Sequence, residues 1–147
     1  MLIIKDSYKK YSALMKYALN TCSSFSLVFE KDDYNSNCYI SEDIYLLIKP
    51  YVNEVISIGK HPDTGTCFLD SDFMKIDLNN ITYLVLMEAQ CILDWNGERF
   101  PEELCFYRKS HKWLTSISHE RLIQIHNYNS SDIKFLKSED IPYQITL

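Results

Sequence analysis

The sequence predicts a single α+β domain over residues 1–147, with an antiparallel or mixed sheet of about five to six strands and three to four helices mainly on one face. Three observations lead to this prediction. The chain has 147 residues, a length that suits one core, and 46% of them are hydrophobic. Segments with the apolar spacing of helices are interspersed with segments in which apolar residues alternate with polar ones. No internal repeat, linker or low-complexity run divides the chain.

Two helices are predicted in the first half of the chain, at residues 7–21 and 41–50. The first has apolar side chains at helical spacing on one stripe, and Asp6 or Ser7 can cap its start. The second begins at Ser41, a cap residue followed by two acids, which the helix dipole favours in a first turn.

Three strands are predicted in the same half, at residues 24–31, 52–58 and 67–78. In the first, Phe25, Leu27 and Phe29 alternate with smaller residues, which indicates a strand with one buried face. In the third, an irregularity is expected near residues 70–72.

Residues 81–95 are strongly apolar and longer than a usual strand, so we expect a buried helix capped by Asn79 or Asn80 and closed at Gly97. A continuous strand is the alternative, because Ile, Tyr and Val favour β structure. Three alternating segments then predict a meander of strands, at residues 104–108, 112–119 and 122–126. A final helix is expected at residues 129–140, capped by Ser130 or Ser131.

Acidic residues are concentrated in the middle of the chain. The whole chain has a net charge of −5, but residues 32–103 carry fourteen acids against four bases. This balance argues against nucleic acid as a partner and suits a basic protein. The candidate contact residues are Asp32, Asp33, Asp63, Asp70, Asp72 and Asp77, with Tyr34 and Tyr39 as aromatic anchors. The alternative is that these acids form a scattered, solvated surface.

The sequence contains no motif that indicates an enzyme, a cofactor or a metal site. With three glycines, the chain has neither a GxGxxG motif nor a phosphate-binding loop, and it has no GxSxG elbow. The histidines lack the spacing of a zinc site, and the acids near Asp70 lack the glycine and glutamate of a calcium loop. We therefore expect no catalytic activity, no cofactor and no metal.

His119 is the centre of the alternative in which the chain is a small enzyme or a ligand-binding domain. On a strand ending at residue 119, it shares a face with Trp113, and Glu120 points to the other face. Glu120 is then a poor partner for acid–base work. A distant acid, Glu88 or Glu103, would have to complete a pocket around His119.

The compartment predicted from the sequence is the cytoplasm. The five cysteines are odd in number and form no CxxC, which indicates reduced thiols. We expect no signal peptide, because the N-terminal apolar run is three residues long, and no apolar run approaches the length of a membrane span.

The stretch PEELCFYRKSHKWLTSISHE, with ILDW before it, resembles a pattern in a family of small uncharacterised bacterial proteins. SFSLVFEK and SSDIKFLKSED are similar to further positions of that family. Ser118 stands where the pattern has Ala. The resemblance implies no activity, since none is established for the family.

By type, an acidic chain of this size also resembles bacterial immunity proteins that neutralise toxins. The leading hypothesis is therefore a non-catalytic immunity protein that occupies a basic toxin surface. A third hypothesis is a structural protein that self-associates through its eleven tyrosines and seven phenylalanines.

Overall fold

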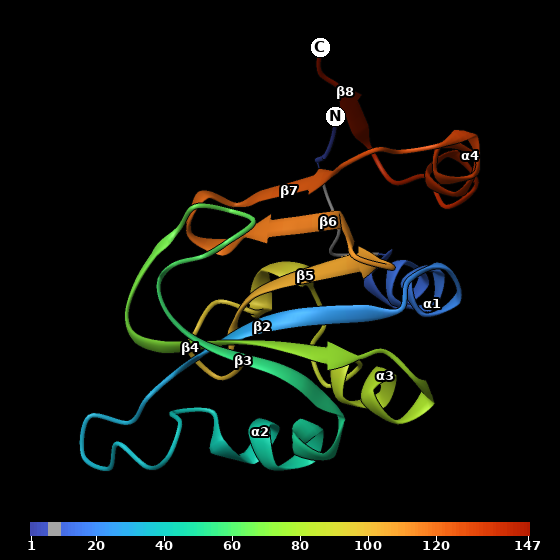
Figure 1. The fold of residues 1–147 in the computed structure, drawn as a ribbon. Coiled ribbons are helices and arrows are strands. Elements are labelled where there is room, and N and C mark those ends of the chain that lie inside the picture. The colour runs from blue at the N-terminus through green and yellow to red at the C-terminus, as the bar shows by residue number, and fades with distance from the viewer. Residues whose placement is uncertain (6–9) are drawn as a thin grey trace.

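The computed structural model describes residues 1–5 and 10–147 (Figure 1). The strands are β1 (Leu2–Ile4), β2 (Ser24–Glu30), β3 (Val52–Lys60), β4 (Cys67–Asp77), β5 (Glu102–Arg108), β6 (His111–Ile117), β7 (Leu122–Ile125) and β8 (Tyr143–Ile145). The helices are α1 (Tyr11–Thr21), α2 (Glu42–Ile48), α3 (Asn80–Leu86) and α4 (Ser130–Ser138), with 3-10 turns η2 (Lys49–Tyr51), η3 (Ile92–Asp94) and η4 (Ser118–Glu120). The predicted caps of the first helix, Asp6 and Ser7, lie outside the described residues. Within the described part of the chain, no helix is long and apolar enough to cross a membrane.

The α+β class is confirmed, but the predicted number of strands is wrong. In the described residues the sheet has eight strands, in the order β3-β4-β2-β5-β6-β7-β1-β8, and every pairing is antiparallel. The two strands that we did not expect are β1 and β8, which pair with each other near the chain ends. Each is three residues long, too short to show a period of two, and each is a strand only because of its neighbours.

The predicted helix over residues 81–95 is wrong in its second half. The helix α3 ends at Leu86, and a turn leads into the 3-10 turn η3. The carboxylate of Asp94 accepts hydrogen bonds from the backbone N–H groups of Gln90 and Cys91, at 2.9 and 3.0 Å. These bonds stabilise a second capped turn instead of a continuous helix. Gly97 has a φ of +87°, the left-handed conformation that we expected there.

The N-cap residue was predicted correctly at two helices, α2 and α3. The side chain of Asn79 accepts hydrogen bonds from two backbone N–H groups at the start of α3, as expected. The helix α4 is instead capped by Asn129, which precedes the expected Ser130 and Ser131. Ser41 is the N-cap residue of α2, as expected, with two acids in the first turn, but its side chain makes no capping hydrogen bond. Serine, asparagine and aspartate all cap well, so a run of such residues does not identify which one precedes the first turn.

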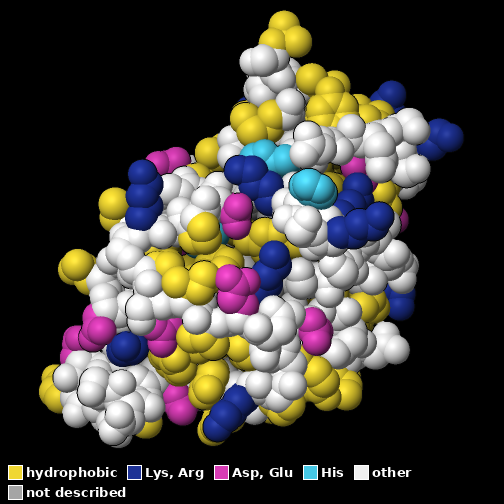
Figure 2. Space-filling view, in the orientation of Figure 1, with side chains coloured by type: hydrophobic (Ala, Val, Ile, Leu, Met, Phe, Trp, Pro, Cys, Tyr) yellow, Lys and Arg dark blue, Asp and Glu magenta, His cyan; other side chains and the backbone are white. Residues whose placement is uncertain are grey.

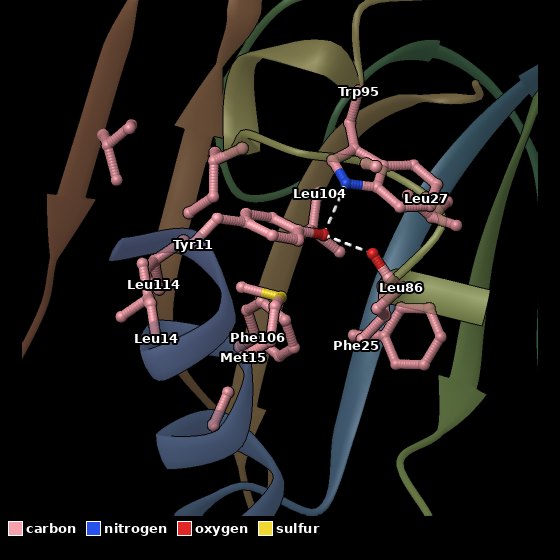
Figure 3. Packing of buried hydrophobic residues seen from close by; sticks show 14 of the residues in the cluster. Tyr11, Leu14, Met15, Phe25, Leu27, Leu86, Trp95, Leu104, Phe106 and Leu114 are labelled. Carbon is pink, nitrogen blue, oxygen red and sulfur yellow. Dashed lines mark hydrogen bonds between the residues drawn. The ribbon is translucent and has the colours of Figure 1, made fainter. Parts of the chain in front are cut away.

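The apolar core lies between the sheet and the helices (Figure 3). Phe25 of β2 and Phe106 of β5 are fully buried in it. The hydroxyl of Tyr11 in α1 donates to the backbone oxygen of Leu86 at 2.6 Å and accepts from Nε1 of Trp95 at 3.1 Å. This pair of hydrogen bonds satisfies the polar atoms that two large aromatic side chains bring into the core. Burial raises the pKa of Tyr11 well above its ordinary value.

The tip of the β3–β4 hairpin covers part of the other face of the sheet. The Tyr107 hydroxyl of β5 donates to Asp63 in this tip at 2.6 Å and lies 2.9 Å from the hydroxyl of Ser26 in β2. The ammonium of Lys112 in β6 donates to the backbone oxygen of Asp63 at 3.3 Å. Consequently residues 24–29 of β2 are buried on both faces, and our expectation of one buried face was wrong.

Candidate functional site

A groove with a volume of about 660 Å³ lies where the hairpin tip meets one end of the sheet. The strands β2 and β6 end at this point, at Glu30 and Ile117, and β5 begins there at Glu102. The turn η4 adds His119 and Glu120, and residues 64–69 of the hairpin form the opposite wall. The groove therefore gathers residues that are up to ninety positions apart in the chain.

A β-bulge brings two consecutive glutamates to the same region. The register of β2 and β5 shifts between Ser26 and Val28, so β5 contains one extra residue there. Glu103 has a φ of +55°, a left-handed conformation that is uncommon for a residue other than glycine. Glu102 lines the groove, while Glu103 contacts the hairpin tip beside it. A regular strand would have pointed the two side chains to opposite faces.

Glu103 is fully buried beneath the groove. Its two carboxylate oxygens accept hydrogen bonds from the hydroxyls of Thr64 and Thr66, at 2.6 and 2.5 Å. Burial raises the pKa of Glu103, and the two threonine hydrogen bonds partly offset this effect. The carboxylate therefore joins the hairpin tip to the sheet, and it holds the wall of the groove in place.

The groove is acidic. Three carboxylates line it, from Glu30, Glu102 and Glu120, and none of its lining residues is lysine or arginine. Burial raises the pKa of Glu102 to about 6, with further contributions from the negative charges of Glu103 and Glu30. A cation that entered the groove would relieve this repulsion. At the rim, the side chain of Leu69 is 88% exposed, which is unusual for a large apolar residue.

His119 lines this groove, but it does not lie on the strand that we expected. The strand β6 ends at Ile117, and His119 and Glu120 belong to the turn η4. The turn brings Nε2 of His119 within 3.9 Å of Oε1 of Glu120, whereas we expected Glu120 to point away. Both side chains are more than half exposed. A contact of this length between exposed groups contributes little energy and does not fix a catalytic geometry.

The other two residues of the predicted pocket lie elsewhere. Glu88 is exposed just after α3, beside a different and smaller cavity. Trp113 is buried in the core, where its Nε1 donates to Asp132 at 3.3 Å. The structure therefore does not bring Glu88, Trp113 and His119 together. The acids that share the groove with His119 are Glu30, Glu102 and Glu120, and Glu102 is placed there by the bulge in β5.

Three of the predicted partner-binding residues are engaged inside the molecule. Asp72 is 7% exposed and accepts hydrogen bonds from the hydroxyls of Tyr39 and Ser57, at 2.6 and 2.9 Å. Asp63 accepts the hydroxyl of Tyr107 and holds the hairpin tip. Tyr39 also packs against Phe29. Because their polar groups are satisfied internally, Asp63, Asp72 and Tyr39 support the fold.

The other predicted partner-binding residues are on the surface but do not form one patch. Asp32, Asp33 and Tyr34 follow β2 directly after the groove, and Asp70 follows Leu69 at its rim. Asp77 is at the far end of β4, where it accepts a hydrogen bond from Asn53. Figure 2 shows acidic side chains scattered over the face in view, with Lys and Arg between them. Of these five residues, Asp32, Asp33, Tyr34 and Asp70 therefore lie near the groove, and Asp77 does not.

A second cavity, of about 610 Å³, lies at the other end of β5 and β6 and has the opposite character. Its basic side chains and histidines are Arg108, Lys109, His111, Lys112 and His126. Arg108 is already paired within the molecule, because its guanidinium donates to both carboxylate oxygens of Asp132, at 3.1 and 2.8 Å. Burial lowers the pKa of His126, which favours its neutral form. One of the three lysine and arginine side chains of this cavity is therefore compensated by a carboxylate, whereas the three carboxylates of the acidic groove have no lysine or arginine among the lining residues.

Among the residues that the structure describes, no group of three or more His, Cys, Asp or Glu side chains is placed to hold a metal ion. No protein-family model, no curated protein and no solved structure matches the chain. The resemblances to a bacterial family and to immunity proteins therefore stay predictions.

Proposed function

We propose that this chain is a cytoplasmic protein-binding domain without catalytic activity, and that the acidic groove binds a basic surface of its partner. The observation that carries the proposal is the set of three carboxylates in one groove with no lysine or arginine among its lining residues. In keeping with the type resemblance, the partner is a toxin domain that the chain neutralises as an immunity protein.

The groove has the features of an interface centre. A lysine or arginine of the partner would pair with Glu30, Glu102 and Glu120, and the exposed Leu69 would be buried at the rim. Because burial, and after it the repulsion from neighbouring carboxylates, raises the pKa of Glu102 to about 6, an entering cation would release its proton. Binding should therefore tighten as the pH rises from about 5 to about 7.

The test is binding to the products of the genes adjacent to the one for this chain, measured by titration calorimetry with each purified protein. Glu120→Lys changes an exposed charge in the groove, and Leu69→Ala removes the apolar rim. Each should weaken binding of a basic partner by about tenfold or more. Glu88→Lys makes the same charge change at an exposed residue outside the groove and is the matched control.

The expected result has two parts. Glu120→Lys slows association, most strongly at low salt, while Leu69→Ala mainly speeds dissociation. Co-expression of the wild-type chain, but not of Glu120→Lys, then restores the growth that the partner suppresses. Equal binding of the wild type and both groove variants would refute the role of the groove. A basic partner that binds without loss of its toxicity would refute neutralisation.

One observation favours a second function, a small enzyme or ligand-binding domain with its site around His119. The groove contains a carboxyl of raised pKa, Glu102, together with His119, and its volume is in the range of small-ligand pockets. The substitution His119→Asn separates the two functions. It would abolish acid–base chemistry, whereas it should change the affinity for a basic protein by less than about threefold, since His119 is half exposed.

A further inference from the structure

The strand β3 is a long and open edge of the sheet. It is the first strand in the sheet order, so within the described sheet β4 is its one neighbour. Residues 53–57 are all exposed, and Val55 and Ile56 are 53% and 42% exposed. The opposite edge, β8, is three residues long. A long apolar edge without proline presents unpaired backbone N–H and C=O groups, which is a template for another strand.

The regular part of β3 extends from Glu54 to Lys60. Its register with β4 keeps one offset from Glu54 to Ile58. The irregularity before this segment is an extra residue at Asn53. The irregularity after it lies in β4, where Asp70 has a φ of +47°. The outer side of β3 is therefore a straight segment of extended backbone, free of bulges of its own.

We propose that β3 pairs antiparallel with β3 of a second copy of this chain, with Ser57 opposite Ser57. In this register Glu54 lies opposite Lys60 of the second copy, and the same pair recurs at the other end by symmetry. Between the two ion pairs, Ile56 and Ile58 lie opposite each other twice. The four cross-strand pairs form one strip on one face of the joined sheet, apolar in the middle and charged at both ends.

The other face of the joined edge is also complementary. There Val55 of each copy lies opposite Gly59, a residue with open space around it, so the exposed valine gains a contact without a clash. Moving the pairing by two residues in either direction leaves Glu54 or Lys60 opposite an isoleucine. The charges thus select one register, as they do in natural strand pairs.

Both charges are available for this role. Within the described residues, neither Glu54 nor Lys60 has an ion-pair partner within 4.0 Å. Lys75 is opposite Glu54 on β4, but its ammonium lies over the ring of Tyr107, 4.1 Å from the centroid. Charged side chains on an edge strand usually discourage pairing with an unrelated strand. In the symmetric pair, however, the negative charge of Glu54 lies opposite the positive charge of Lys60 at both ends.

The paired form would be a closed dimer. Its two-fold axis is perpendicular to the sheet, so the faces covered by the hairpin tips, and with them both acidic grooves, lie on the same side. Pairing consumes the open edge of each copy, which leaves only the short β8 edges. None of the groove residues that bind in the proposed function lies on β3, so the two proposals stand or fail separately.

The test is sedimentation velocity on the whole chain at concentrations up to about 1 mM, with the wild type and three variants. Glu54→Lys and Lys60→Glu each place like charges opposite one another twice, and each should raise the dissociation constant of the dimer by about tenfold or more. The double variant Glu54→Lys, Lys60→Glu exchanges the two charges and should dimerise like the wild type. Glu88→Lys, at an exposed residue outside β3, is the control for net charge.

Mixing the two single variants gives the sharpest result. A Glu54→Lys chain carries two lysines and a Lys60→Glu chain two glutamates, so the mixture should form a heterodimer although each alone is a monomer. Because Glu54, Lys60 and Glu88 are exposed, every variant should unfold at the same temperature as the wild type at dilutions where each chain is a monomer. A wild type that is a monomer throughout, or a mixture that stays monomeric while the wild type dimerises, would overturn the proposal.

Discussion

The two faces of the sheet are covered in different ways. The face toward the helices is apolar, and residues such as Phe106 and Leu27 are fully buried there. The face toward the hairpin tip is held by polar contacts, among them those of Tyr107 with Asp63 and of Glu103 with two threonines. The neighbours Phe106 and Tyr107 point to opposite faces: Phe106 packs in the apolar core, and Tyr107 makes polar contacts with the hairpin tip.

This difference separates stability from function. The hydrophobic effect does not depend on the direction of a contact. The stability of the helix-covered face therefore depends mainly on how much apolar volume is buried there, and it falls when a large side chain is replaced by a small one. On the face toward the hairpin tip, each buried polar group needs a hydrogen-bond partner at a defined position. Such polar contacts leave charged groups near the surface on this side of the sheet. The acidic groove accordingly opens beside the hairpin tip, where Glu103 and Thr66 hold one of its walls. Three experiments test this comparison.

The largest expected effect is on the helix-covered face. Phe106→Ala removes a fully buried ring and should lower the free energy of unfolding by about 3–5 kcal/mol. Tyr107→Phe, one residue along, removes only a hydroxyl from the other face and should cost about 1 kcal/mol. Urea unfolding of both variants measures the difference. Equal losses would mean that the two faces do not differ in this way.

An intermediate effect is expected under the hairpin tip. Thr66→Val keeps the shape of the side chain but removes the hydrogen bond to the buried carboxylate of Glu103, which should cost about 1.5–3 kcal/mol. Thr146→Val, on the exposed C-terminal segment, should cost less than about 0.5 kcal/mol. The comparison is again made by urea unfolding. A loss at Thr66 no larger than at Thr146 would show that the tip does not depend on Glu103.

The smallest effect concerns the pH dependence of stability. The pKa of Glu102 is raised from 4.5 to about 6 in the folded chain, so the folded state holds this proton more tightly than the unfolded state. The resulting stability is fully present below pH 4.5 and is lost as the pH rises through about 6. Because the side chain is partly exposed, the loss should be less than about 1 kcal/mol. Glu102→Gln should remove it.

The measurement is urea unfolding of the wild type and Glu102→Gln at pH 4.5 and pH 7, with the pH values chosen from the shift itself. From pH 4.5 to pH 7, the free energy of unfolding should fall more for the wild type than for Glu102→Gln. Parallel behaviour of the two proteins would show that Glu102 has no raised pKa.

Much of the fold could be predicted from the sequence because its signals are local. Alternation at Phe25, Leu27 and Phe29 identified β2, and the cap at Asn79 located the start of α3. The irregularity expected near Asp70 is present in β4. Less of the candidate site could be predicted. His119 was singled out and does line the groove, whereas Glu102 was not, because two adjacent strand residues normally point apart.

The sequence by itself therefore determined the α+β class, most of the strands and the acidic balance of the chain, all of which follow from the type and the period of neighbouring residues. The tertiary structure alone decided three further features: the pairing of β1 and β8, the closure of the hairpin tip over β5, and the bulge that gathers Glu102 and Glu103. Each depends on contacts between segments far apart in the chain. Such contacts leave no periodic signal in either segment alone.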